Sequence, residues 1–569
     1  MKKAVIALAG LVGVALVATG AGGSAPTSPL SKVSHIVVIY EENHSFDNLY
    51  GQWEGVNGSA NAATAEKTQV SQNGTPFTCL KQLDVNLTSP PLAATCTDST
   101  TGTTFTSAFA NTGQFSIDTY IPPTATTCPS PTVFGPANGI PNGSGLPGGC
   151  TRDLVHRYYQ EQYQLDGGKM DRYVAGSDSA GTVMGAYNTK ALPIYAYLHE
   201  DGHPHYAIAD DFFQAAFGGS FLNHQWLVAA QSPVWAGAPN DAGPNDLHSV
   251  VDANGMPNNY PFYASPLGTS VKDANLTASC NPPAGRPPTP AGVECGDFAV
   301  NTTQPWYQPY SPGTADSRRL PPLRNLTIGD ELTAAKVSWA WYSGGWSNAD
   351  GDVGAPGWTN GNGPNCIDPL HNVNAVYPNC PDGDFQFNHQ AFNYYASFAP
   401  GTAQRALDLR DEAEFIQLAQ SSTKTCNLRQ VSFIKPLGEE NEHPGYASEG
   451  AGSDHLVQLL NDIEGSACAK DTMVIVTYDE FGGQWDHVPP PGQGSATKGP
   501  HDAWGPGTRI PALVLSPYLH GPFVVDHTEH DTTSILATIE HRFGVQALGN
   551  RDAQVPDLSS VFAANPAVK

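Results

Sequence analysis

The sequence predicts an α/β protein with a doubly wound, mostly parallel sheet, helices on both faces and long loop insertions. Short runs of Val, Ile and Leu flanked by turn residues recur along the chain, as expected for strands buried on both faces. Segments with helical spacing of apolar residues alternate with these runs. Polar residues follow several of the runs, and open α/β sheets place ligand sites at the carboxyl ends of their strands.

The composition is that of a loop-rich globular protein. The 569 residues include 58 Gly and 48 Pro, and 40% of them are hydrophobic, which argues against disorder. The net charge of −26 opposes binding to nucleic acid, because phosphates repel an acidic surface. A phosphate substrate would need a local cation to offset this field. The oligomeric state stays open.

The first residues predict export. Lys2 and Lys3 precede an apolar run over 4–19 and small residues over 20–25, so we expect residues 1–25 to be a signal peptide. The protein would then be periplasmic or secreted. No later run is apolar enough for a transmembrane anchor. We expect residues 26–569 to form one domain, with insertions at about 52–150 and 232–323.

Ten cysteines follow the expected signal peptide, and an even number in an exported chain favours disulfides. No two of them have the C-x-x-C spacing of metal or thiol-redox motifs. We expect sequence neighbours to pair, which gives Cys79–Cys96, Cys128–Cys150, Cys280–Cys295, Cys366–Cys380 and Cys426–Cys468.

The expected elements follow from the apolar periodicity. Strands are expected over 34–40, 206–213, 337–346, 430–435, 472–478 and 508–516. Helices are expected over 153–164, 192–198, 403–420, 453–463 and 532–543, and a further helix opens at Ser220.

Two of the expected strands run into acids at their carboxyl ends. Glu42 and Asn43 follow the first strand, and Asp479 and Glu480 follow the strand over 472–478. In one parallel sheet these ends share an edge, so the four side chains could supply oxygen ligands to one hard or borderline cation. The alternatives are a helix N-cap after the first strand and an acidic surface turn after the second.

Ser220 stands at the start of a helical run after Gly218 and Gly219. A hydroxyl there faces free N–H groups and the positive end of the helix dipole, which suits attack on a phosphate. The alternative is a simple N-cap, and the pattern differs from the G-x-S-x-G nucleophile elbow. Further polar groups after expected strands include His389 and His443, whereas His156 near a helix start is open to a structural role.

Three segments carry a resemblance to a known family. Residues 42–47 followed by Gly51 resemble the E-N-x-S-F-D motif of the bacterial phosphoesterase family, which contains phospholipases C and acid phosphatases. Residues 477–490 match its T-Y-D-E-x-G-G-x-x-D-H-V-x-P motif, and residues 505–518 resemble G-x-G-x-R-V-P-x-x-x-x-S-P-Y. The resemblance implies an alkaline-phosphatase-like fold.

The same resemblance implies roles for individual residues. Residues that match metal-binding positions are Glu42, Asn43, Asp479 and Glu480. Residues that match the nucleophile and the histidines of the phosphate pocket are Ser220, His156, His389 and His443. Residues expected to contact substrate are Asn223, His224 and Asn388, and Asp486 and His487 are expected to support the loop around the site.

The function implied is a secreted, metal-dependent acid phosphatase that cleaves small phosphomonoesters through a phosphoserine intermediate. One divalent ion is expected as cofactor: Ca²⁺, Mg²⁺, Mn²⁺ or Zn²⁺. A first alternative is a phospholipase C that recognises phospholipid headgroups. A second is a catalytically inactive secreted binding protein. An arylsulfatase is disfavoured, because the C-x-P-x-R maturation motif is missing from the sequence.

Overall fold

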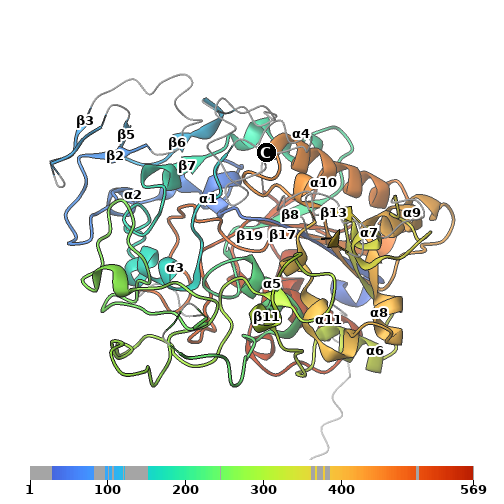
Figure 1. Cartoon of the computed structure of the whole chain (residues 1–569). Coiled ribbons are helices and arrows are strands. Elements are labelled where there is room, and N and C mark those ends of the chain that lie inside the picture. Colours follow the sequence, from blue (N-terminus) through green and yellow to red (C-terminus); the bar gives the residue numbers. More distant parts are fainter. Residues whose placement is uncertain are drawn as a thin grey trace, which may run out of the picture.

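An eight-stranded sheet runs through the centre of the molecule (Figure 1). The computed structural model describes residues 28–82, 96–99, 102–105, 108–119, 121, 151–241, 243, 245–359, 366–367, 376–377, 385–494 and 499–567. The expected signal peptide lies outside these residues. In spatial order the strands are β15 (Leu409–Asp411), β12 (Trp339–Ser343), β16 (Val431–Lys435), β1 (His35–Glu41), β17 (Thr472–Tyr478), β18 (Ala512–Leu515), β8 (Tyr206–Ala209) and β19 (Phe523–Asp526).

The sheet is mostly parallel, which confirms the predicted α/β class. β1 lies between β16 and β17 and is parallel to both, with Ile39 opposite Ile434 and Glu41 opposite Tyr478. All seven residues of β17 are buried. β18 is antiparallel to β17 and to β8. The described residues between β17 and β18 contain no crossover helix, and a parallel return generally needs one.

Helices cover both faces of the sheet (Figure 1). One face carries α4 (Pro193–Tyr197), α9 (Glu412–Ser421) and α10 (Glu449–Glu464), and α10 packs on the other two. The opposite face carries α5 (Ser220–Ala229), α6 (Ile328–Ala334) and α11 (Thr533–Phe543), and α5 packs on both α6 and α11. The remaining helices are α1 (Phe46–Leu49), α2 (Thr64–Lys67), α3 (Tyr158–Leu165), α7 (Trp346–Asp350) and α8 (Ala403–Asp408).

Two helix predictions need correction. The helix expected over 403–420 is interrupted by β15, and Asp411 then caps α9 by accepting a hydrogen bond from the N–H of Ala413 at 3.0 Å. Pairing of β15 with β12 outweighs the helical periodicity there. The helix expected over 153–164 begins only at Tyr158. His156 therefore precedes the helix, in a segment whose Val155 N–H donates to Asp178 Oδ1 at 3.1 Å.

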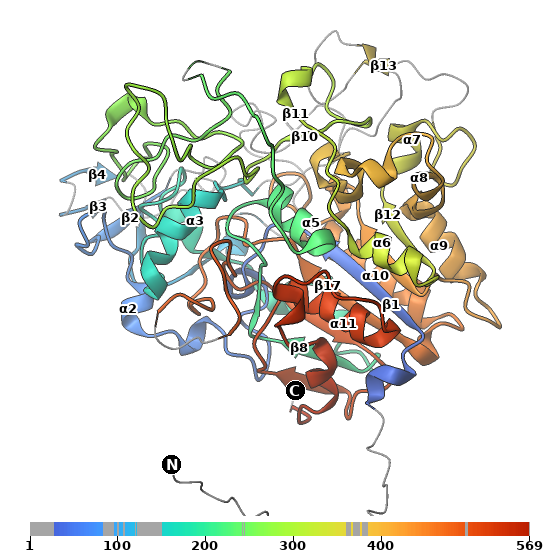
Figure 2. The same cartoon turned by 90° about the horizontal axis from the view of Figure 1, so that it is seen from below.

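The two insertions pack together beside the sheet. In Figures 1 and 2 the first, in blue, and the second, in green, lie on the same side of the core. The rings of Phe77 and Phe262 are 5.0 Å apart, and Gln72 Nε2 donates to the carbonyl of Ala264 at 3.0 Å. Phe77 belongs to the main hydrophobic core, so the described part of the first insertion shares the core of the sheet.

Three predicted disulfides are confirmed: Cys79–Cys96, Cys280–Cys295 and Cys426–Cys468. The predicted pairs Cys128–Cys150 and Cys366–Cys380 involve cysteines outside the described residues. A search of the described residues for helices long and apolar enough to cross a membrane finds none.

Candidate active site

The carboxyl ends of β1 and β17 bring four predicted residues together. Because these strands are parallel neighbours, the segments that follow them leave the same edge of the sheet. The N–H of Asn43 donates to Asp479 Oδ1 at 3.0 Å, and the N–H of Glu480 donates to the same oxygen at 2.8 Å. Glu42, Asn43, Asp479 and Glu480 are all fully buried.

A close approach of two turns fixes this geometry. Asn43 has a φ of 62°, a left-handed conformation that Asn tolerates better than most residues. Gly482 has a φ of 61°, and a Cβ there would lie 2.1 Å from the carbonyl oxygen of Asn43. Only glycine fits at this contact. The Gly-Gly turn after Glu480 therefore allows the two strand ends to touch.

The buried carboxylates need positive charge. Burial raises the pKa of Asp479 and of Glu480 well above the usual range, and neighbouring carboxylates raise both further. Asp479 Oδ2 has no hydrogen-bond partner among the described residues. Ionised carboxylates without partners are costly to bury, so the arrangement favours a bound cation.

Lys435 supplies one positive charge to this group. It is the last residue of β16 and is buried, with its Nζ 2.6 Å from Glu42 Oε1 and donating to the carbonyl of Tyr40 at 3.3 Å. The sequence reasoning did not assign it a role. A lysine at the end of an apolar strand indicates an acidic partner nearby, since buried lysines are rare unless paired.

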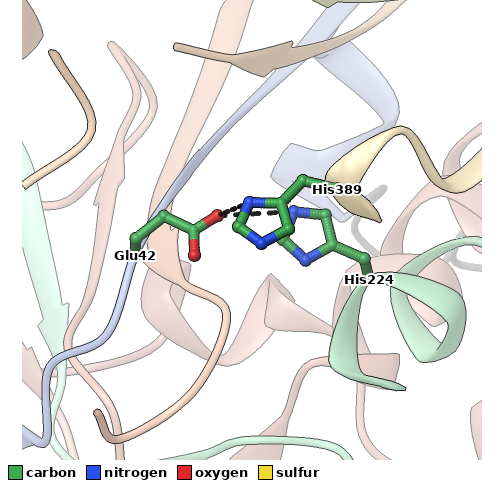
Figure 3. A group of neighbouring side chains, drawn as sticks. All are labelled: Glu42, His224 and His389. Atoms are coloured by element: carbon green, nitrogen blue, oxygen red, sulfur yellow. Dashed lines mark ion pairs between the residues drawn. The ribbon is translucent and has the colours of Figure 1, made fainter. Parts of the chain in front are cut away.

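Two histidines face the same carboxylate (Figure 3). His389 Nδ1 lies 2.8 Å from Glu42 Oε1, and His224 Nε2 lies 3.6 Å from it. The two rings stack with centroids 4.7 Å apart. Burial lowers the pKa of both well below the usual range, and nearby positive groups lower each further, so both are neutral imidazoles with metal-ligand chemistry. The structure thus places His224, expected to contact substrate, deep beside Glu42.

Ser220 is the first residue of α5, and its hydroxyl faces the buried acids. Its Oγ lies 3.4 Å from Asn43 Oδ1 and 3.4 Å from Glu480 Oε1. The N-cap position belongs to Gly219, so Ser220 is not the capping residue. This excludes the simple N-cap interpretation. The first N–H groups of an α-helix have no partner within the helix, and in α5 they lie at the same end as the Ser220 hydroxyl.

A polar brace holds the turn before Ser220. Asn223 Oδ1 accepts from the N–H of Ala216 at 2.9 Å, and its Nδ2 donates to the carbonyl of the same residue at 3.0 Å. Glu161 Oε2 accepts from the N–H of Gly218 at 2.5 Å. The side chain of Asn223 therefore forms hydrogen bonds with main-chain groups and holds the turn in position. Its expected contact with substrate stays a prediction.

His156 and His443 contact the two side chains that lie beside the hydroxyl, Glu480 and Asn43. His156 Nε2 lies 3.5 Å from Glu480 Oε1, and His443 Nε2 lies 3.1 Å from Asn43 Nδ2. The Nδ1 atoms lie 2.5 Å from the carbonyl of Leu154 and 2.8 Å from that of Pro444, respectively. These contacts place a proton on each Nδ1, which leaves each Nε2 lone pair directed into the site.

A cavity of about 470 Å³ opens beside this group. Its lining includes His156, Arg157, Gly219, Phe221, Asn301 and Tyr446. Residue 301 lies within the segment 232–323, predicted to be the second insertion, and this segment forms one wall. Asn388, expected to contact substrate, is half-buried, and its carbonyl accepts from the hydroxyl of Tyr394 at 3.4 Å. The contacts described for Asn388 do not join it to Ser220 or to the buried acids.

Asp486 and His487 belong to a separate cluster with Asp47 and Arg509. Arg509 Nε lies 3.1 Å from Asp486 Oδ1, and Arg509 Nη2 lies 3.2 Å from Asp47 Oδ1. The N–H of His487 donates to Asp47 Oδ2 at 3.0 Å. All four residues are buried. The cluster ties the loops after β1 and β17 together. The supporting role expected for Asp486 and His487 stays a prediction.

Comparison with known proteins finds a matching family and several relatives. The profile of the Phosphoesterase family matches residues 33–546. Phospholipase C B of Mycobacterium tuberculosis is 37% identical over 155 residues, which are 24% of this chain and 29% of that protein. Non-hemolytic phospholipase C of Burkholderia pseudomallei is 23% identical over 539 residues, which are 90% of this chain and 55% of that protein. The chain thus spans only part of the length of these relatives.

Proposed function

Because the chain belongs to the Phosphoesterase family, we propose that it is a metal-dependent hydrolase of phosphomonoesters in which Ser220 is the nucleophile. One observation carries the proposal: the Ser220 hydroxyl, at the start of a ten-residue helix, lies 3.4 Å from Glu480 Oε1 at the edge of a buried group of carboxylates. The helix N–H groups bind phosphoryl oxygens, and the carboxylates bind a cation.

The residues present fit one divalent ion. Glu42, Asn43, Asp479 and Glu480 would hold it, since these four side chains offer oxygens at one buried place and Asp479 Oδ2 has no hydrogen-bond partner among the described residues. Such an ion lowers the pKa of a nearby hydroxyl and neutralises charge on phosphoryl oxygens. The neutral imidazoles of His224 and His389 form a group with Glu42 and offer nitrogen donors beside that carboxylate.

The protein residues carry the proton transfers. Ser220 Oγ forms a bond to phosphorus as the bond from phosphorus to the alcohol oxygen breaks. The hydroxyl proton has an acceptor in Glu480 Oε1, which also lies 3.5 Å from His156 Nε2. The proton passes through these contacts to His156, which lines the cavity and gives it to the leaving oxygen. In the second step His156 takes a proton from water as the water oxygen forms a bond to phosphorus and the bond from phosphorus to Ser220 Oγ breaks. The proton then returns to Ser220 Oγ through Glu480.

Removal of the hydroxyl tests this proposal. Ser220→Ala should lower hydrolysis of p-nitrophenyl phosphate by about 10³-fold or more, while metal content and the folded state are retained. Ser421→Ala, at an exposed position of α9, is the matched control and should keep full activity. Near wild-type turnover of Ser220→Ala would exclude serine as the nucleophile.

Phospholipase C activity is a second candidate, because two of the relatives carry that name and the cavity beside Ser220 has room for a lipid headgroup. Both reactions would use the same serine. A ratio of rates on p-nitrophenyl phosphate and on phosphatidylcholine micelles separates them. A higher kcat/KM on the soluble monoester supports the phosphatase.

We also propose export to the periplasm or the medium. Three disulfides support this location, since such bonds persist in oxidising compartments. Fractionation of expressing cells tests it: protein found in the cytoplasm with its first 25 residues intact would contradict export.

A further inference from the structure

Lys435 lies directly against one of the buried carboxylates of the site. Its Nζ is 2.6 Å from Glu42 Oε1 at a fully buried position. β16 and β1 are parallel neighbours with Ile434 opposite Ile39, so the register brings Lys435 alongside Tyr40, whose carbonyl its ammonium group also contacts. Sheet pairing therefore fixes the stem of the side chain, and its tip is held by the ion pair with Glu42 and the hydrogen bond to the carbonyl of Tyr40.

The position of Lys435 matters because it changes the net charge of the buried carboxylate group. With a cation bound and all three acids ionised, Glu42, Asp479 and Glu480 would carry three negative charges, and the ammonium group that faces Glu42 would add one positive charge. The remaining excess of two negative charges equals the charge of one divalent ion. Without Lys435 the same carboxylates would attract more positive charge than one divalent ion brings, because Coulomb interactions are strong where water is excluded.

We propose that Lys435 is a fixed cation in the place of a second divalent ion, and that it sets the metal content of this site at one. The inference rests on the proposed metal site at the carboxylates and adds the residue that determines its stoichiometry. Since Lys435 holds Glu42 through Oε1, it also leaves Glu42 Oε2 available as a ligand.

Metal binding by charge variants tests the proposal. Wild-type protein and the Lys435→Met variant are stripped with EDTA and titrated at pH 7.5 with Mn²⁺, Mg²⁺, Ca²⁺ and Zn²⁺ in turn. Calorimetry gives affinity, and elemental analysis after gel filtration gives bound ions per chain. Lys424→Met makes the same charge change at an exposed position and is the matched control, and Lys435→Arg keeps the charge.

We expect one ion per chain in the wild type, in Lys424→Met and in Lys435→Arg. In Lys435→Met the first ion should bind at least about tenfold more tightly, because a neighbouring like charge is gone, and a second ion should bind. Thermal unfolding of the metal-free Lys435→Met variant should occur at lower temperature than in the wild type, and added metal should restore it.

Each outcome decides between separate claims. A wild type that binds two ions tightly overturns the proposal even if Lys435→Met does not fold. A Lys435→Met protein with one ion and unchanged affinity also overturns it, while the proposed function stands. A wild type that is active and binds none of the four metals contradicts the metal dependence itself.

Discussion

Two buried acidic clusters lie after the same pair of strands, and they differ in how the protein neutralises them. In the cluster of Asp47 and Asp486, Arg509 donates to both carboxylates. In the cluster of Glu42, Asp479 and Glu480, Glu42 is the carboxylate that forms an ion pair with Lys435. Asp479 Oδ2 has no hydrogen-bond partner in the described part of the chain. The protein itself therefore neutralises the carboxylates of the first cluster, whereas those of the second need a bound cation. We call the first cluster complete and the second incomplete.

The largest expected effect comes from the incomplete cluster. Asp479→Asn keeps an oxygen to accept from the N–H groups of Asn43 and Glu480, so the fold should survive. Loss of the charge should remove the metal and lower phosphatase activity by about 10³-fold. Asp454→Asn, on the exposed side of α10, is the control. A variant Asp479→Asn with full metal content would contradict the assignment.

The complete cluster should respond in the opposite way. Arg509→Met leaves Asp47 and Asp486 buried without their cation, so it should lower the free energy of unfolding by about 3–5 kcal/mol. Molecules that remain folded should still bind the metal. Urea denaturation and elemental analysis measure the two effects separately. Metal loss without destabilisation would show that the two clusters are one site.

A third acidic group, in which His455 of α10 pairs with Glu412, sharpens the comparison through pH. Burial opposes protonation of His455, but the Glu412 carboxylate at 3.0 Å outweighs it and raises the pKa of His455 to about 9. The ion pair therefore stabilises the fold fully below about pH 6.5, and this stabilisation is lost as pH rises through 9.

The stability difference between wild type and His455→Gln should accordingly shrink by about 3 kcal/mol between pH 6 and pH 10. Urea unfolding at a series of pH values measures it. A constant difference over this range would mean that the pair does not change its protonation.

The smallest expected effect concerns the brace before Ser220. In Glu161→Gln an amide N–H would face the N–H of Gly218 or of Thr508, which now donate to the carboxylate. We expect kcat to fall about tenfold as the serine shifts, with KM and metal content unchanged. Glu200→Gln, at an exposed position, is the control. An unchanged kcat would show that Ser220 needs no such support.

The sequence was sufficient for the sheet and for the strand ends. Strand β17 and the acids after it were predictable, because a buried apolar run that ends on carboxylates is a strong local signal. The break between α8 and α9 was not, since the pairing of β15 with β12 is a contact between distant segments. The antiparallel direction of β18 was not predictable either, because it depends on the path of the loop between β17 and β18, and the spacing of apolar residues contains no information on that path.

The acids and the serine of the candidate site were predictable from the sequence, but the cations that neutralise the buried carboxylates were not. Glu42 and Ser220 follow from local pattern, whereas Lys435 and Arg509 acquire meaning only through partners tens to hundreds of residues away. His224 was expected to contact substrate, and its full burial beside Glu42 follows from the orientation of α5. Side-chain direction on a helix relative to a sheet edge is tertiary information.

The central claim is that Ser220 attacks phosphorus with the help of the incomplete cluster. Metal-loaded enzyme mixed with a fast phosphomonoester substrate, quenched in acid within one turnover and digested, can be analysed by mass spectrometry. We predict a phosphoryl group on Ser220 in the wild type and none in the metal-free enzyme. A phosphoryl group on another residue, found either after the acid quench or after a parallel quench in base that preserves phosphohistidine, would contradict the account, and so would full turnover with no phosphorylated residue.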